Sequence, residues 1–118
     1  MTFTALVATH STGSYMENEC ALEGFNANLA IDFGAFGIIA NSIAPGTVRM
    51  GMTRDLLNDL VVADHFTSRV PAGRVGEVKD IASAIALLAD EDAGFCKGTK
   101  TRLDGGYALG SYTGSWSQ

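Results

Sequence analysis

The sequence contains no lysine or arginine before Arg49, whereas residues 1–48 contain four acidic side chains. The formal net charge of the whole chain is −5. Nucleic acids and anionic membrane surfaces are bound mainly through lysine and arginine. The charge balance therefore argues against both as partners.

Other common signals are also missing. No apolar run approaches the ~20 residues that a membrane-spanning helix needs, and the N-terminus has no basic segment, so no signal peptide is predicted. The two histidines are isolated and form no zinc-binding pattern. Cys20 and Cys96 form no C-x-x-C motif and are interpreted as two buried free thiols in a reducing compartment, which predicts a cytoplasmic protein. No metal site is expected.

The chain has the size and composition of one folded domain, with 118 residues of which 47% are hydrophobic. Apolar runs typical of strands alternate with apolar repeats at helical spacing, which predicts an α/β fold with a small parallel sheet and packed helices. The domain is expected over residues 1–109, followed by a flexible Gly/Ser-rich tail over 110–118. Strands are predicted at 5–9, 38–44 and 101–103, and helices at 15–33, after Thr53 and around 81–88.

The first predicted helix contains the sequence Tyr15-Met16-Glu17-Asn18-Glu19-Cys20-Ala21-Leu22-Glu23-Gly24-Phe25. Three further motifs follow in order: Asn41-Ser42-Ile43-Ala44-Pro45-Gly46, then Val70-Pro71-Ala72-Gly73-Arg74-Val75-Gly76-Glu77 with Asp80-Ile81-Ala82, then Leu103-Asp104-Gly105-Gly106. Together they resemble the C-terminal half of the short-chain dehydrogenase/reductase (SDR) family. The resemblance implies a truncated Rossmann-like fold.

The departures from the family pattern concern its redox chemistry. Glu19 stands where the family's Tyr-x-x-x-Lys motif has lysine, and the family threonine that contacts nicotinamide falls at Met50. The family's catalytic serine falls at Thr2, and no glycine-rich dinucleotide loop follows a first strand. The expected cofactor is therefore none, and NAD(P)-dependent activity of this chain alone is not expected.

Tyr15 and Glu19 are one helical turn apart and share a helix face. An ionised Glu19 would raise the pKa of Tyr15, where a lysine would lower it. A neutral Tyr15 could donate a hydrogen bond to a carbonyl oxygen while Glu19 accepts a proton, a pairing suited to an isomerase, lyase or cyclase. The alternative interpretation is that Glu19 is a solvated residue favoured by the helix dipole and that Tyr15 packs.

The candidate catalytic residues are thus Tyr15, Glu19 and His10, the last lying between a predicted strand and the helix. For His10 a surface or capping role is the alternative. The candidate substrate pocket consists of Met16, Pro45, Gly46, Met50 and Met52, although ordinary core filling by the methionines is the competing interpretation.

Three functions stay open at this point. The first is a repurposed, cofactor-independent enzyme that uses Tyr15 as acid or hydrogen-bond donor on a small molecule. The second is a non-catalytic remnant or interaction module. The third is an oxidoreductase fragment whose N-terminal half is missing or supplied by a partner. The resemblance also implies a homodimer or higher oligomer through the 15–33 helix and the last strand.

Overall fold

The computed structural model describes residues 13–109, with side chains described from residue 20 onward. The strand predicted at 5–9 and the tail over 110–118 lie outside these residues. The helices are α1 (Gly13–Gly34), α2 (Arg54–Asn58), α3 (Leu60–Thr67) and α4 (Val78–Ala89), with short 3-10 turns η2 (Glu91–Ala93) and η3 (Tyr107–Leu109). The strands are β1 (Ser42–Pro45), β2 (Val48–Arg49), β3 (Gly76–Glu77) and β4 (Lys100–Leu103).

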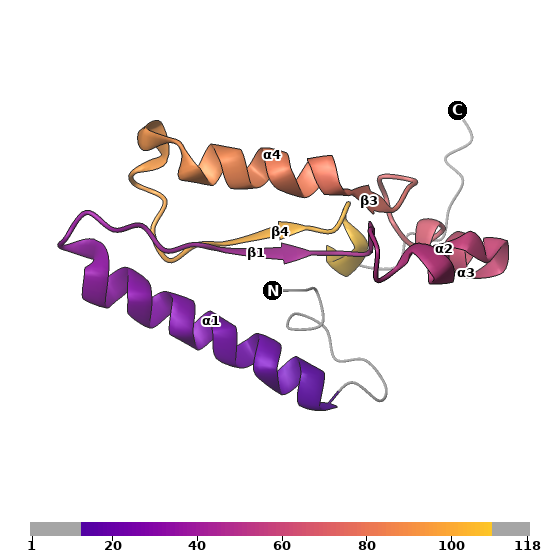
Figure 1. Ribbon diagram of the computed structural model, residues 1–118, viewed down its shortest axis with the longest axis horizontal. Coiled ribbons are helices and arrows are strands. Elements are labelled where there is room, and N and C mark those ends of the chain that lie inside the picture. Colours follow the sequence, from indigo (N-terminus) through magenta and orange to yellow (C-terminus); the bar gives the residue numbers. More distant parts are fainter. Residues whose placement is uncertain (1–12, 110–118) are drawn as a thin grey trace.

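The architecture is a helix–sheet–helix sandwich, which confirms the predicted α/β fold with small parallel sheets. β1 pairs in parallel with β4, in a register that sets Ser42 opposite Lys100 and Pro45 opposite Leu103. α1 lies on one side of this pair and α4 on the other (Figure 1). A second parallel pair, β2 with β3, was not predicted.

α1 ends where the sequence predicts, because two glycines follow its last apolar residue. The final helical residue is Gly34, and Gly37 has a positive φ of 77° that other residues rarely adopt. Lys97 donates a hydrogen bond to the exposed carbonyl of Gly34 at 3.0 Å, and Lys100 of β4 forms an ion pair with Glu23. These contacts attach α1 to the segment that leads into β4.

β1 is shorter than the strand predicted over residues 38–44. Only Ser42–Pro45 pairs with β4, whereas residues 38–41 were also expected to be strand. β1 is short because its partner strand begins late. Gly98 has a φ of 68°, which does not fit a strand, and β4 begins only at Lys100. Before β1, the Asn41 side chain links the two segments: it accepts a hydrogen bond from Thr99 N and donates one to the Cys96 carbonyl.

The helix predicted after Thr53 is two helices, α2 and α3, separated by Asp59. Thr53 does not cap α2 with its side chain; its hydroxyl bonds the carbonyl of Val48 instead. Leu57 of α2 is buried, whereas Leu56 of α2 and Leu60 and Val61 of α3 are exposed. α3 contains no buried residue.

α4 confirms the helix predicted from its apolar spacing. Glu77 and Asp80 form a capping box at its start, in which each side chain accepts a hydrogen bond from the other residue's backbone N–H. Ile81 and Ile85 of this helix line the space beside β1.

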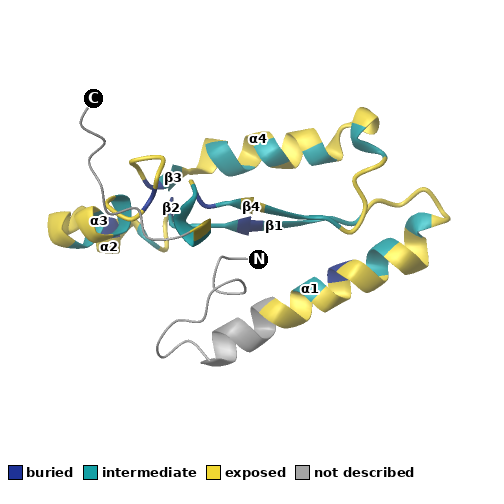
Figure 2. Ribbon diagram, turned by 180° about the vertical axis from the view of Figure 1, so that it is seen from behind, coloured by how far each residue is buried: buried dark blue, intermediate teal, exposed yellow. Residues whose placement is uncertain are grey.

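The described core is small. The buried apolar residues are Ala44, Val48, Leu57, Val70 and Val75, and no large side chain among the described residues is fully buried. Exposed positions cover much of α1, α3 and α4 (Figure 2). Cys20 and Cys96 are also exposed, so the expectation of buried thiols was wrong: Cys20 lies on an exposed stretch of α1, and Cys96 in the loop before β4.

Candidate functional site

The candidate site lies where β1 and β4 both end. Parallel strands bring their carboxyl ends to one edge, and ligands of open α/β sheets bind outside that edge. Gly46 follows β1 and donates its N–H to the carbonyl of Leu103, the last residue of β4, at 3.0 Å. A Cβ atom on Gly46 would lie 2.8 Å from Asp104 Cα, so only glycine permits this close approach.

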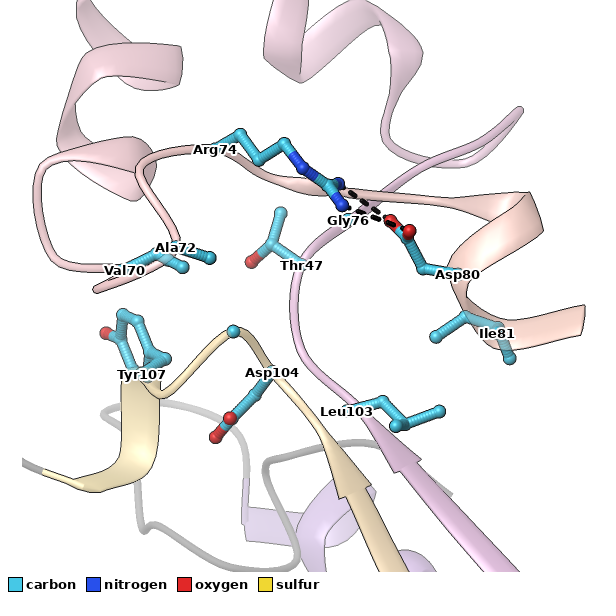
Figure 3. Close-up of a pocket in the computed structure, with 11 residues that line it drawn as sticks. Thr47, Val70, Ala72, Arg74, Gly76, Asp80, Ile81, Leu103, Asp104 and Tyr107 are labelled. Carbon is cyan, nitrogen blue, oxygen red and sulfur yellow. Dashed lines mark hydrogen bonds and ion pairs between the residues drawn. The ribbon is translucent and has the colours of Figure 1, made fainter. Parts of the chain in front are cut away.

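A cavity of about 220 Å³ opens beside these strand ends (Figure 3). Its walls come from the segment after β1, the loop before β3, the first turns of α4 and the turn after β4. The lining residues are Thr47, Val70, Ala72, Arg74, Gly76, Asp80, Ile81, Leu103, Asp104, Gly105 and Tyr107. The cavity is small enough that only a compound of a few heavy atoms would fit inside it.

Arg74 and Asp80 form a two-pronged ion pair on one wall of the cavity (Figure 3). Arg74 Nη1 lies 2.7 Å from Asp80 Oδ2, and Nη2 lies 3.0 Å from Oδ1. The hydrogen bond from Arg74, together with one from the Glu77 backbone N–H, lowers the pKa of Asp80 to about 2. Asp80 is therefore ionised at neutral pH and is no proton donor there.

Asp104 is the buried acidic residue of the cavity, with 8% of its surface exposed. Its carboxylate accepts hydrogen bonds from Gly106 N and Ala108 N, both at 2.9 Å, and lies 3.5 Å from Arg102 Nε. These contacts hold the turn that starts η3, so the primary role of Asp104 is structural.

The two glycines of that turn are used for packing and form no open loop. Both have positive φ, 63° at Gly105 and 94° at Gly106. A Cβ atom on Gly105 would lie 2.6 Å from Val70, and one on Gly106 would lie 2.9 Å from Pro71. Protein atoms occupy the side on which a Cβ would stand, so only glycine fits at these two positions of the turn.

The residues predicted from the sequence are only partly brought together. Tyr15, Met16 and Glu19 lie in the first turns of α1, but their side chains are outside the described residues, as is His10. Pro45 lines a second space, between α1 and α4, and Gly46 packs against Asp104.

Met50 and Met52 lie in the loop after β2, with 42% and 83% of their surfaces exposed. Thr53 holds this loop, because its hydroxyl accepts a hydrogen bond from Met50 N at 3.1 Å. Neither methionine lines the 220 Å³ cavity. Their place in a substrate pocket stays a prediction.

Sequence reasoning did not identify Thr47, Arg74, Asp80 and Tyr107 as residues of one cavity. Arg74 and Asp80 belong to one stretch around β3, and the parallel pairing of β1 with β4 and of β2 with β3 brings this stretch beside Thr47 and the turn before Tyr107. The sequence signal that could have pointed to this edge is that glycine-containing segments, Pro45-Gly46 and Asp104-Gly105-Gly106, follow two predicted strands.

Within residues 13–109 no three His, Cys, Asp or Glu side chains come together as metal ligands would. No helix in that range has the length and apolar character to cross a membrane.

Comparison with known proteins gives consistent matches. The protein family described as Enoyl-(Acyl carrier protein) reductase matches residues 1–108. A 3-oxoacyl-[acyl-carrier-protein] reductase of Haemophilus influenzae is 41% identical over 96 residues, which is 81% of this chain and 39% of the reductase. An L-rhamnose 1-dehydrogenase (NAD(P)(+)) of Azotobacter vinelandii is 35% identical over 102 residues, which is 86% of this chain and 40% of the dehydrogenase.

The solved structure of a 4-hydroxyisoleucine dehydrogenase complexed with NADH superposes with a TM-score of 0.89 at 28% identity, covering 93% of this chain and 45% of the dehydrogenase. A gluconate 5-dehydrogenase from Burkholderia cenocepacia, in complex with NADP and tartrate, gives a TM-score of 0.85 at 28% identity, covering 92% of this chain and 43% of that enzyme. The chain thus spans about two fifths of the length of the relatives it matches. It belongs to the short-chain dehydrogenase/reductase family and corresponds to the C-terminal region of that fold.

Proposed function

We propose that this chain binds a small carbonyl compound at the carboxyl ends of β1 and β4 and acts on it by acid–base chemistry, without a nicotinamide cofactor. Its relatives are named as reductases and dehydrogenases, enzymes that interconvert carbonyl and alcohol groups. We propose different chemistry for this chain because Glu19 occupies the family's lysine position, on the helix that retains Tyr15.

The residues present do not fit a dinucleotide. Glu19 is acidic where the family has a lysine. Met50 offers no hydroxyl where the family has threonine. No step of the proposed chemistry therefore passes through NAD(P).

The proposed step is enolisation. Glu19 accepts a proton from the carbon next to the carbonyl while the Tyr15 phenol donates a hydrogen bond to the carbonyl oxygen, and return of the proton to a different carbon completes an isomerisation. Glu19 disfavours the ionised phenolate, which keeps Tyr15 in its donating form. His10, three residues before α1 in the sequence, is the third proposed participant.

The test measures deuterium exchange next to the carbonyl in a panel of small ketones by NMR, in D2O without cofactor. We expect exchange with the natural chain, and a loss of about 100-fold or more in Tyr15→Phe and Glu19→Gln. Tyr112→Phe, in the C-terminal tail, is the matched control and should keep the full rate. Submillimolar NADH or NADPH binding in a calorimetric titration, followed by hydride transfer, would refute the proposal.

A second candidate is the C-terminal half of an oxidoreductase completed by a nucleotide-binding half. Two observations favour this candidate. The chain covers 39–45% of the length of its relatives, and apolar side chains are exposed on α1 and α4. In that case the chain binds NAD(P)H only after the other half is added, and the Glu19→Lys variant gains turnover. A non-catalytic interaction module would show neither result.

A further inference from the structure

Arg74 uses only part of its guanidinium in the ion pair with Asp80. A guanidinium carries five N–H groups. Nη1 donates to the Val75 carbonyl at 3.1 Å and to Asp80 Oδ2 at 2.7 Å, and Nη2 donates to Asp80 Oδ1 at 3.0 Å. The Nε–H and the second N–H of Nη2 have no partner among the described residues. These two groups lie side by side on the other edge of the planar guanidinium, which can bind a carboxylate through two parallel hydrogen bonds.

Arg74 is held in place and is open to solvent. Asp80 fixes one edge of the guanidinium, and the same carboxylate accepts a hydrogen bond from Glu77 N at 2.8 Å at the start of α4. The Arg74 side chain is nevertheless 55% exposed, and the residue lines the 220 Å³ cavity. A ligand would therefore meet a guanidinium that is already oriented, which lowers the entropy cost of binding.

Thr47 supplies a second polar group to the cavity. Its backbone carbonyl accepts a hydrogen bond from Gly76 N at 2.9 Å, which fixes the residue between the two parallel strand pairs. Its hydroxyl has no hydrogen-bond partner among the described residues and points toward the side of the cavity where Val70 and Tyr107 lie (Figure 3). This hydroxyl is available to donate to a carbonyl oxygen.

The rest of the cavity presents an apolar wall and no uncompensated negative charge. The apolar lining residues are Val70, Ala72, Ile81 and Leu103. The Asp104 carboxylate is occupied by Gly106 N, Ala108 N and Arg102, and it points away from Arg74 (Figure 3). Each acidic residue of the cavity thus has a cationic partner, so an entering carboxylate is not opposed by a free one.

We propose that this cavity accepts a small keto acid, whose carboxylate binds the free edge of Arg74 and whose carbonyl oxygen accepts a hydrogen bond from Thr47. The inference rests on the binding site of the proposed function, because it names the class of carbonyl compound that the site takes. A carbonyl oxygen has two lone pairs, so the bond from Thr47 leaves room for the one proposed from Tyr15. The short carbon chain of the ligand lies against the apolar wall.

The test compares two probes of equal size, pyruvate and its neutral amide pyruvamide, in NMR titrations of the full chain at constant ionic strength. We expect pyruvate to bind at least about tenfold more tightly, because its hydrogen bonds to Arg74 are charge-assisted. The Arg74 Nε–H signal should shift with pyruvate and stay in place with pyruvamide. The Gly76 amide, beside Thr47, should respond to both probes.

Two variants separate the two contacts. Arg74→Lys keeps the positive charge next to Asp80 but lacks the second planar edge, so pyruvate should bind about tenfold more weakly while pyruvamide is unaffected. Thr47→Val removes the hydroxyl at nearly constant shape and should weaken both probes about equally, by roughly fivefold. Arg54→Lys, at an exposed position of α2 outside the cavity, is the matched control and should change neither.

Three results would overturn the inference: equal affinity for the two probes, an Arg74 Nε–H signal that does not move at saturation, and full pyruvate affinity in a folded Arg74→Lys. If that variant does not fold, the Nε–H signal of the natural chain and Thr47→Val decide. Selective pyruvate binding without deuterium exchange would support this inference and count against the proposed acid–base chemistry. Exchange in neutral ketones, with equal affinity for both probes, would overturn this inference and leave that chemistry standing.

Discussion

At the scale of single residues, the ion pair between Arg74 and Asp80 joins the loop before β3 to the start of α4. Asp80 receives hydrogen bonds from two directions, the Arg74 guanidinium and the Glu77 backbone N–H. The pair also raises the pKa of Arg74. Protonation of Asp80 would therefore weaken the loop contact and the helix cap together.

This predicts a defined acid sensitivity. The pKa of Asp80 is lowered from 3.8 to about 2 in the folded chain, so its stabilising contribution is present above pH 3.8 and is lost as the pH falls toward 2. In thermal melts from pH 7 to pH 2, Asp80→Asn should melt lower than the natural chain at pH 7, and the difference should shrink below pH 3.8. Asp92→Asn is the control. A difference that stays constant with pH would contradict the assignment.

Gly46 gives a second prediction at this scale. An alanine Cβ would lie 2.8 and 2.9 Å from the Cα and Cβ atoms of Asp104, and the strand ends would have to separate. We expect Gly46→Ala to lower the free energy of unfolding by about 1–3 kcal/mol in urea denaturation. Gly51→Ala is the matched control, since a Cβ there meets nothing within 4 Å. Equal stability of the two variants would argue against the close approach.

At the scale of secondary-structure elements, Asp59 decides that one predicted helix becomes two. Its Oδ1 accepts hydrogen bonds from Val61 N at 2.9 Å and Val62 N at 3.3 Å, while its own backbone is extended with φ −73° and ψ 116°. The side chain thus competes with helix continuation and starts α3 anew.

Removing that cap should weaken α3. We expect Asp59→Ala to cost about 1 kcal/mol, seen as a lower urea midpoint and faster amide exchange in residues 60–67. Asp64→Ala, within the same helix, should be neutral or slightly stabilising, because alanine favours helix more than aspartate does. If Asp59→Ala left exchange in α3 unchanged, the capping role would be wrong.

At the scale of the whole molecule, the described sandwich has few buried apolar residues and many exposed ones. Contiguous exposed apolar surface marks interaction sites in soluble proteins. On α1, Ile31 is 76% exposed, and on α4 Leu87 is 69% exposed. The homodimer or higher oligomer proposed for the α1 helix and the last strand would cover part of this surface.

Sedimentation equilibrium tests that assembly. The natural chain should be dimeric or larger at micromolar concentration, and Ile31→Asp should shift it toward the monomer by at least about tenfold in dissociation constant. Asn28→Asp introduces the same charge at another exposed position of α1 and should have a smaller effect. A monomeric natural chain would refute the oligomer.

The sequence by itself determined the family, the α/β class and the elements whose signals are local. α1 ends at its glycines and α4 follows its apolar spacing, because capping and periodicity depend on residues a few positions apart. The family motifs likewise lie within short continuous segments. The loss of the family lysine at Glu19 is also visible in the sequence alone.

Only the tertiary structure decided how long β1 is, where the chain breaks between α2 and α3, and which residues surround the cavity. A strand is as long as its partner allows, and β4 begins at Lys100. Lys100 also supplies the opposite charge for Glu23 of the acidic first half, across more than half the chain. The Arg74–Asp80 pair and Tyr107 line one cavity for the same physical reason: parallel pairing joins segments that are far apart in sequence, and no local pattern specifies such an arrangement.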